Sequence, residues 1–492
     1  SSSGAQCMLR SRGGLSRPYP ACTGSGRAGG ERQPKDTLDP PHCACVHIYI
    51  FTYTVKTDTP TTAGETETET PPESRTMAAS SAPAAPSQFD QVPLAPPDPI
   101  FGLTLAFRAD PDPAKVNLGV GAYRTEEGLP WVLDSVRQAE ELLLQEKANH
   151  EYLPIDGLAE FRDLTAKLIL GEDSKAIQEK RVASCQSLSG TGALRLAAGT
   201  LVRFFPDAEV FVSDPTWGNH NTIFGHAGFK VGKYRYWDAK NRGLNLEGML
   251  EDLTSAPDGS IIVLHACAHN PTGVDPTQEQ WEEIADVLVQ KKHKIIFDTA
   301  YQGFASGDPD QDAWAVRRFV DRGMEVMITQ SYSKNFGLYG ERIGALVAVT
   351  ANADAAAQLH SQVKVIARGM YSNPPSFGAR LVCKIMGDKA MYQQWRDELR
   401  VMAGRINEMR TALRSELERL GCPGSWDHVT SQIGMFSFTG LSADQVKVMT
   451  EKHHIYLTAN GRISMAGLNT KNVAYVASAI LDSIQTAPAP SK

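Results

Sequence analysis

Short apolar runs alternate with helix-length amphipathic segments through the middle of the chain. One amphipathic segment, 278–289, separates two of the runs and has the apolar spacing of a helix. Apolar runs divided by helices are typical of βα units, which build a largely parallel sheet covered on both faces. We therefore predict an α/β fold. The runs expected to form strands are 210–212, 261–264, 294–297, 324–329 and 345–349.

The pattern changes after residue 387. Residues 388–420 place apolar side chains three and four positions apart, among them Trp395, Leu399 and Ile406, which predicts one long amphipathic helix. A packing helix that joins two domains is the interpretation we favour. Residues 433–480 then mix strand and helix signals, which indicates a smaller α+β domain.

Residues 1–88 do not have the composition of a domain. Six basic side chains face one acid over the first 35 residues, and a Thr/Glu repeat at 66–70 and Ala/Pro/Ser tracts follow. Such segments bury too little apolar surface to offset chain entropy, so we predict a disordered extension. Two interpretations of 1–76 stay open: either these residues do not belong to the natural protein, which would start at Met77, or they are a targeting segment.

Composition excludes several classes of function. The net charge of −7 provides no basic surface for nucleic acid. The apolar run at 46–55 is too short to cross a bilayer, so we predict no membrane partner. The cysteines of the main body are scattered singly, without the spacing of a metal site, which predicts no metal and fits a reducing compartment. We predict a cytoplasmic protein, with a mitochondrial or plastid location as the alternative.

The most informative stretch is 331–342, Ser-Tyr-Ser-Lys-Asn-Phe-Gly-Leu-Tyr-Gly-Glu-Arg, which follows a predicted strand. Lys334 is flanked by small hydroxyl side chains, and Arg342 lies eight residues further on. A lysine near a fixed guanidinium in a partly desolvated pocket has a lowered pKa. Such an amine can form a Schiff base with a carbonyl group. A solvated loop lysine would be the default for Lys334 taken in isolation.

Other polar residues also follow predicted strands or begin helices. Asp298 ends the run 294–297, and a carboxylate there needs a partner, either a protonated ring nitrogen or a backbone turn. Small residues at 189–194 precede an Ala/Leu-rich segment, where helix N–H groups can bind an anion. A plain helix cap is an equal alternative. Arg368 and Arg462 would suit a substrate with two carboxylates, although single arginines usually lie on a solvated surface.

These motifs together resemble the aspartate aminotransferases, which use pyridoxal phosphate (PLP), from about residue 98 to 480. The 331–342 string matches the Schiff-base segment of that family. The resemblance implies that Lys334 binds PLP and moves a proton between the substrate α-carbon and the C4′ carbon of the cofactor. It implies that Asp298 pairs with the pyridine nitrogen, and that Trp217 stacks on the ring with His220 behind it. Lys334, Asp298, Tyr301 and Trp217 are the expected catalytic residues.

The same resemblance implies the other contacts. Tyr301 and Asn270 would bind the phenolic oxygen, Arg462 the α-carboxylate and Arg368 the distal carboxylate, and Gly121 would line the substrate entrance. The residues expected to hold the phosphate are Gly190, Thr191, Ser331, Arg342 and Tyr152, and Ser189 and Ser333 are also expected to bind the cofactor. Arg368 and Tyr152 would come from the second subunit of a homodimer.

The resemblance also implies an architecture and an activity. The expected fold is a mostly parallel seven-stranded sheet in a large domain, 131–400, with a small α+β domain built from both chain ends. The small domain would comprise 401–488 and part of 89–130, which also forms an N-terminal arm. The expected reaction exchanges an amino group between L-aspartate and 2-oxoglutarate by a ping-pong mechanism. The alternatives are a broader, aromatic specificity, a PLP decarboxylase, or a non-catalytic protein that keeps the fold.

Overall fold

A computed structural model of the 492-residue chain describes residues 87–96 and 98–487. Residues from Gln91 onward form one compact unit. The predicted extension 1–88 lies almost entirely outside the described residues, as does all of 1–76. Within the described part, no helix has the length and apolar character needed to cross a membrane.

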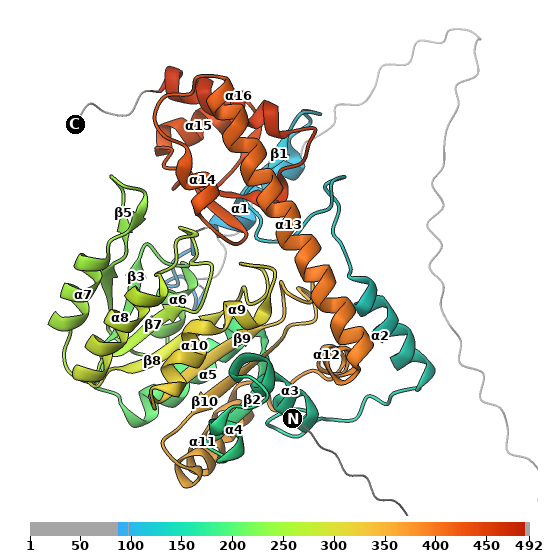
Figure 1. Cartoon of the computed structure of the whole chain (residues 1–492), viewed down its shortest axis with the longest axis vertical. Coiled ribbons are helices and arrows are strands. Elements are labelled where there is room, and N and C mark those ends of the chain that lie inside the picture. Colours follow the sequence, from blue (N-terminus) through green and yellow to red (C-terminus); the bar gives the residue numbers. More distant parts are fainter. Residues whose placement is uncertain (1–86, 97, 488–492) are drawn as a thin grey trace, which may run out of the picture. The chain divides into compact units, whose positions relative to one another are not determined.

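Among the described residues, seven strands form one sheet in the order β2-β10-β9-β8-β7-β3-β4 (Figure 1). Neighbouring strands are parallel except at β10, which is antiparallel to both β2 and β9. The predicted α/β sheet is therefore confirmed as mixed and mostly parallel. The strands are β2 (Val182–Leu188), β3 (Val210–Asp214), β4 (Val231–Arg235), β7 (Ile261–His265), β8 (Lys294–Thr299), β9 (Val326–Ser331) and β10 (Ile343–Val349).

All five predicted strands are present, with small differences at their ends. The run expected from residue 324 begins as a strand only at Val326. The sequence analysis missed β2 and β4. β2 carries buried polar side chains, among them Gln186 and Ser187, and so lacks an apolar run. β4 lies at the edge of the sheet and has exposed positions at Lys233 and Arg235.

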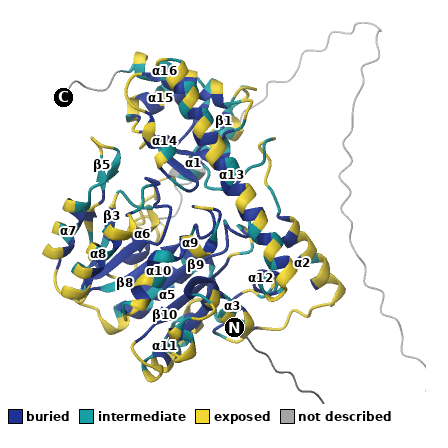
Figure 2. Ribbon diagram, in the orientation of Figure 1, coloured by how far each residue is buried: buried dark blue, intermediate teal, exposed yellow. Residues whose placement is uncertain are grey.

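Helices cover both faces of the sheet, and alternate residues of the central strands pack against the two layers. Ile262 and Leu264 of β7 belong to the cluster on one face, whereas Ile261 and Val263 belong to the cluster on the other. Figure 2 shows the strands as a buried layer between the helices. The first face is covered by α3 (Ala159–Leu170), α8 (Gln278–Gln290), α10 (Trp314–Asp321) and α12 (Phe377–Gly387), and the second by α5 (Ser189–Phe204), α6 (Asn219–Gly225) and α11 (Ala353–Tyr371).

The predicted long helix is confirmed as α13 (Lys389–Arg419). It packs on a group of short elements at the C-terminal end, which are α14 (Asp427–Ser431), β11 (Phe436–Phe438), α15 (Ala443–Glu451), β12 (Ile455–Tyr456), β13 (Arg462–Ser464) and α16 (Val473–Thr486). β1 (Val116–Asn117) pairs with β12, so both ends of the compact unit contribute. The domain boundaries at 130 and 400 stay predictions, and α13 runs unbroken through residue 400.

The remaining elements connect these layers. They are α1 (Pro99–Ala109), α2 (Asp134–Gln145), α4 (Lys175–Gln178), α7 (Leu246–Ser255), α9 (Pro309–Asp312), the hairpin strands β5 (Trp237–Asp238) and β6 (Gly243–Leu244), and a 3-10 turn at Met465–Gly467.

Candidate active site

A cavity of about 240 Å³ lies at the C-terminal ends of the parallel strands. Because β10 is antiparallel to its neighbours, its N-terminal end lies beside the C-terminal ends of the parallel strands. The residue before it, Arg342, therefore lines the cavity. The cavity is lined by twelve residues that the sequence analysis selected: Gly121, Ser189, Gly190, Thr191, Trp217, Asn270, Asp298, Tyr301, Ser331, Ser333, Lys334 and Arg342.

Lys334 reaches this cavity from the loop after β9. Its Nζ lies 5.1 Å from the centre of the Tyr301 ring. Desolvation lowers the pKa of the Lys334 amine to about 8, and the positive charges of Arg342 and Arg462 act in the same direction, while Asp298 opposes them. The amine is therefore partly unprotonated near neutral pH, as a nucleophile or base requires. Burial is the larger cause and the Arg342 guanidinium a smaller one, and the sequence analysis named both.

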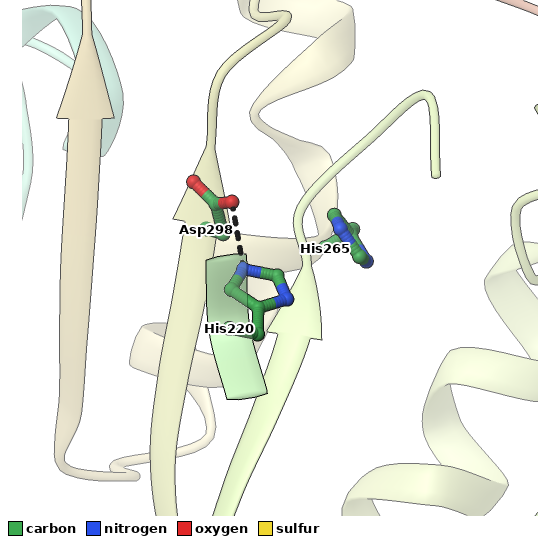
Figure 3. Close-up of side chains that lie close together, drawn as sticks. All are labelled: His220, His265 and Asp298. Carbon is green, nitrogen blue, oxygen red and sulfur yellow. Dashed lines mark hydrogen bonds and ion pairs between the residues drawn. The ribbon is translucent and has the colours of Figure 1, made fainter. Parts of the chain in front are cut away.

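Asp298 is a buried carboxylate at the end of β8. His220 Nε2 lies 3.1 Å from its Oδ2 (Figure 3). On the other side of the imidazole, Thr216 Oγ1 lies 2.8 Å from His220 Nδ1. Burial disfavours the ionised form, but the hydrogen bond from His220 and nearby positive groups together hold the pKa of Asp298 below its usual value. The ionised Asp298 carboxylate thus lines the cavity, where it can pair with a cationic ring nitrogen.

Serine hydroxyls and the first turn of α5 line another part of the cavity. Ser189 Oγ lies 3.1 Å from Ser331 Oγ and 2.8 Å from Ser333 Oγ. Helix α5 begins at Ser189 itself, so the small-residue motif forms its first turn instead of preceding it. A side chain at Gly190 would come within 3.1 Å of Ser331 Cβ, a tight contact that glycine avoids. With Arg342 beside it, this part of the cavity suits a phosphate.

Arg462 lies behind the cavity, in contact with Asn270. Its Nη1 donates to Asn270 Oδ1 at 3.3 Å, and its Nη2 donates to the Gly119 carbonyl at 3.0 Å. The Nε–H group is buried and has no hydrogen-bond partner among residues 87–96 and 98–487. Its hydrogen-bonding capacity is therefore unused within the described part of the chain.

Two predicted site residues, Tyr152 and Arg368, do not line this cavity. The Tyr152 side chain is 83% exposed. Arg368 is exposed on α11, and its Nη1 donates to Ser372 Oγ at 2.6 Å. His220 and Arg462 also lie outside the lining, but each contacts a lining residue.

The cavity also contains side chains that sequence reasoning missed. His265 and Tyr339 both line it. His265 is the last residue of β7, so the strand-end rule that selected Asp298 would have found it. Burial, His269 and His220 lower the pKa of His265 well below its usual value, so the imidazole is neutral. Both His265 ring nitrogens are buried and lack a partner in the part of the chain that is described.

The chemistry of these donors fits pyridoxal phosphate. Hydroxyls, helix N–H groups and a guanidinium suit the phosphate, Asp298 suits the ring nitrogen, and Lys334 suits the aldehyde. Burial also raises the pKa of the Tyr301 hydroxyl, which therefore remains a hydrogen-bond donor.

Comparisons with known proteins agree with this geometry. A family model described as aminotransferase class I and II matches residues 113–480. The mitochondrial aspartate aminotransferase P2 of Lupinus angustifolius is 54% identical over 398 residues, which cover 81% of this chain and 88% of the relative.

Two solved structures are also similar. The aspartate aminotransferase from Saccharomyces cerevisiae cytoplasm has a TM-score of 0.80 and 47% identity, over 81% of this chain and 99% of that one. An aromatic-amino-acid aminotransferase from Burkholderia pseudomallei, covalently bound to pyridoxal phosphate, has a TM-score of 0.79 and 44% identity, over 81% and 99%. On the extent of the family match and the level of identity, the chain belongs to the class I and II aminotransferases.

Proposed function

We propose that the chain is an aspartate aminotransferase, which transfers an amino group between L-aspartate and 2-oxoglutarate and yields oxaloacetate and L-glutamate. The observation that carries this function is the Lys334 amine, whose pKa of about 8 is set by burial in a cavity that also contains the Asp298 carboxylate. Relatives of this name at 54% identity support the choice of substrates.

The cofactor is pyridoxal phosphate. When bound, it supplies an aldehyde that reacts with amines and a ring that accepts electrons. Lys334 would hold the aldehyde, Asp298 the ring nitrogen, and Trp217 the ring face, with His220 orienting Asp298. Asn270 and Tyr301 would bind the phenolic oxygen. The residues proposed to hold the phosphate are Ser189, Gly190, Thr191, Ser331, Ser333 and Arg342, together with Tyr152 of a second subunit.

The chain itself would contribute a base and a fixed anion. An amine with a pKa of about 8 can take a proton from the substrate α-carbon near neutral pH and return it, which we assign to Lys334. Asp298, held ionised beside His220, stabilises positive charge at the ring nitrogen. Both groups are desolvated, which strengthens their electrostatic interactions.

Two arginines would select a dicarboxylic substrate. Arg462 has a free, buried Nε–H for the α-carboxylate, and Gly121 lines the cavity next to this region. We assign the distal carboxylate to Arg368 of a second subunit. Arg368 and Tyr152 are exposed in this subunit and do not line its cavity, which supports a homodimer with shared sites.

A broader, aromatic specificity is the second candidate. It is favoured by the 44% identity to the aromatic-amino-acid aminotransferase of Burkholderia pseudomallei. For the compartment we propose the cytoplasm. Similar proteins are named for both the mitochondrion and the cytoplasm, so membership of the family does not decide this point.

The absorption spectrum of the purified protein with PLP tests the function. The visible band of bound cofactor should disappear when L-aspartate is added without a keto acid, and should return with 2-oxoglutarate. That reversal is the signature of a ping-pong exchange. Lys334→Ala should bind PLP without this reversible change. A band that ignores aspartate but responds to phenylalanine would favour the aromatic alternative, and absence of any band would favour a non-catalytic protein.

A further inference from the structure

The phenyl ring of Phe436 lies against the guanidinium of Arg462. The central carbon of that guanidinium is 4.1 Å from the ring centre. β11 and β13 pair antiparallel, with Phe438 opposite Arg462 and Phe436 opposite Ser464, so Phe436 is the diagonal neighbour of Arg462. Diagonal neighbours on one face of a sheet are within reach of aromatic and long side chains. The ring contact therefore follows from strand register.

This contact matters because Arg462 is a buried cation without an acidic partner. The Arg462 residue is 5% exposed, and no carboxylate forms an ion pair with it in the described ranges. It donates hydrogen bonds to the Gly119 backbone carbonyl and to the side-chain oxygen of Asn270. A desolvated cation over an aromatic face is attracted by the negative charge of that face. Phe436 thus supplies a neutral partner that leaves the donors of Arg462 free for a ligand.

Phe436 is itself held in place from two further directions. A side chain at Gly121 would come within 2.9 Å of Phe436 Cζ, so the ring edge lies directly against this backbone. Phe436 and Tyr301 form an edge-to-face pair, with ring centres 6.1 Å apart and an interplanar angle of 81°. The ring is buried and has little room to move. Its plane therefore restrains the plane of the guanidinium.

We propose that Phe436 is a positioning residue that sets the plane of Arg462 for binding of a substrate carboxylate. This role rests on the proposed function, because it requires Arg462 to bind the α-carboxylate. Binding of a carboxylate by two parallel hydrogen bonds depends on the orientation of the planar guanidinium. A Phe436 that merely fills the core would affect stability and leave ligand affinity unchanged.

The test compares Phe436→Leu with the wild-type holoenzyme, using succinate as an unreactive dicarboxylate. Calorimetry should show succinate binding weakened by roughly three- to thirty-fold, a range that extends from an exposed to a desolvated cation–π contact. The absorption spectrum of bound PLP should be unchanged, since Phe436 does not line the cofactor cavity. In steady-state kinetics, KM for L-aspartate should rise while kcat changes little, because the contact acts on bound substrate and transition state alike.

Phe319→Leu is the matched control. Phe319 is fully buried, packs on Trp281 and Phe297, and is not among the residues that line the cavity. It should lose stability without losing succinate affinity. If Phe436→Leu is folded and binds succinate as the wild type does, the positioning role is wrong. If the wild type itself does not bind succinate, the proposed function fails first, and the role of Phe436 falls with it.

A second variant keeps the test decisive should Phe436→Leu not fold. Gly121→Ala places a methyl group against Phe436 Cζ and should displace the ring. We expect a similar loss of succinate affinity. Where Phe436→Leu does fold, the two losses should not add in the double variant, because leucine leaves room for the methyl group. Unchanged affinity in Gly121→Ala, or fully additive losses, would contradict the proposed coupling.

Discussion

Lys334 and Tyr301 face each other across the cavity, with Lys334 Nζ 5.1 Å from the centre of the Tyr301 ring. They come from loops that follow adjacent parallel strands, β9 and β8. The Tyr301 ring is thus part of the surroundings that bury the Lys334 amine, and this burial lowers the pKa of the amine to about 8. This relationship makes the chemical reactivity of Lys334 measurable as a function of pH.

We predict that the Lys334 amine of the cofactor-free protein titrates near pH 8. Its folded-state pKa lies below that of an unfolded lysine, about 10.4, so the reactive neutral amine accumulates earlier as pH rises. Competitive labelling with acetic anhydride, read by mass spectrometry, should give a midpoint near pH 8 for Lys334. The exposed Lys240 provides a reference rate in the same sample. A Lys334 midpoint above pH 10 would contradict the effect of burial.

Arg368→Leu should change which substrates the enzyme accepts. If Arg368 binds the distal carboxylate, kcat/KM for L-aspartate should fall about 100-fold or more, since two charged hydrogen bonds are lost. kcat/KM for L-phenylalanine should fall much less. Arg137→Leu removes a different exposed arginine and should affect neither substrate. Equal losses for aspartate and phenylalanine would show that the assignment of Arg368 is wrong.

Gly434→Ala should destabilise the protein more than Gly421→Ala. Both glycines have positive φ, 78° and 65°, so each alanine costs about 1–2 kcal/mol of backbone strain. A side chain at Gly434 would also clash with Ala268 Cβ, whereas nothing lies within 4 Å of one at Gly421. We expect Gly434→Ala to lower the free energy of unfolding by a further ~1–3 kcal/mol in urea titrations. Equal effects of the two substitutions would mean that the loop around Ala268 can shift to accommodate the added methyl group without a cost in free energy.

Arg410→Met should lower stability although it removes a buried charge that forms no ion pair with the described residues. Arg410 is 1% exposed, and it donates hydrogen bonds to the carbonyls of Val429, Gly434 and Phe436. Methionine would leave these acceptors without their donor, at a cost of about 2–4 kcal/mol in the free energy of unfolding.

The matched control for Arg410 lies on the same helix. Arg419 is an exposed arginine of α13, and Arg419→Met should change the free energy of unfolding by no more than about 0.5 kcal/mol. Urea unfolding of the two variants makes the comparison. If Arg410→Met is as stable as Arg419→Met, the three carbonyls find other donors, and the guanidinium does not hold this segment.

Much of the fold was predictable because the relevant signals are local. The apolar runs that became β3, β7, β8, β9 and β10 are continuous in the sequence, and α13 carries an uninterrupted helical period. β2 was not predictable in this way, because it lacks an apolar run and its buried Gln186 finds its hydrogen-bond acceptor, the Pro375 carbonyl, far along the chain. The residues around Lys334 were also predictable, since their motif is contiguous and the strand-end rule places it correctly.

By itself, the sequence determined which polar side chains stand at the ends of strands, among them Lys334 and Asp298, because those positions depend on short-range pattern. Only the tertiary structure decided how they meet. The reversed direction of β10 brings Arg342 to the cavity, and the register of β11 against β13 puts Phe436 on Arg462. The packing of α11 leaves Arg368 exposed. Strand direction, register and burial depend on contacts between segments far apart in the chain, and no local pattern specifies those contacts.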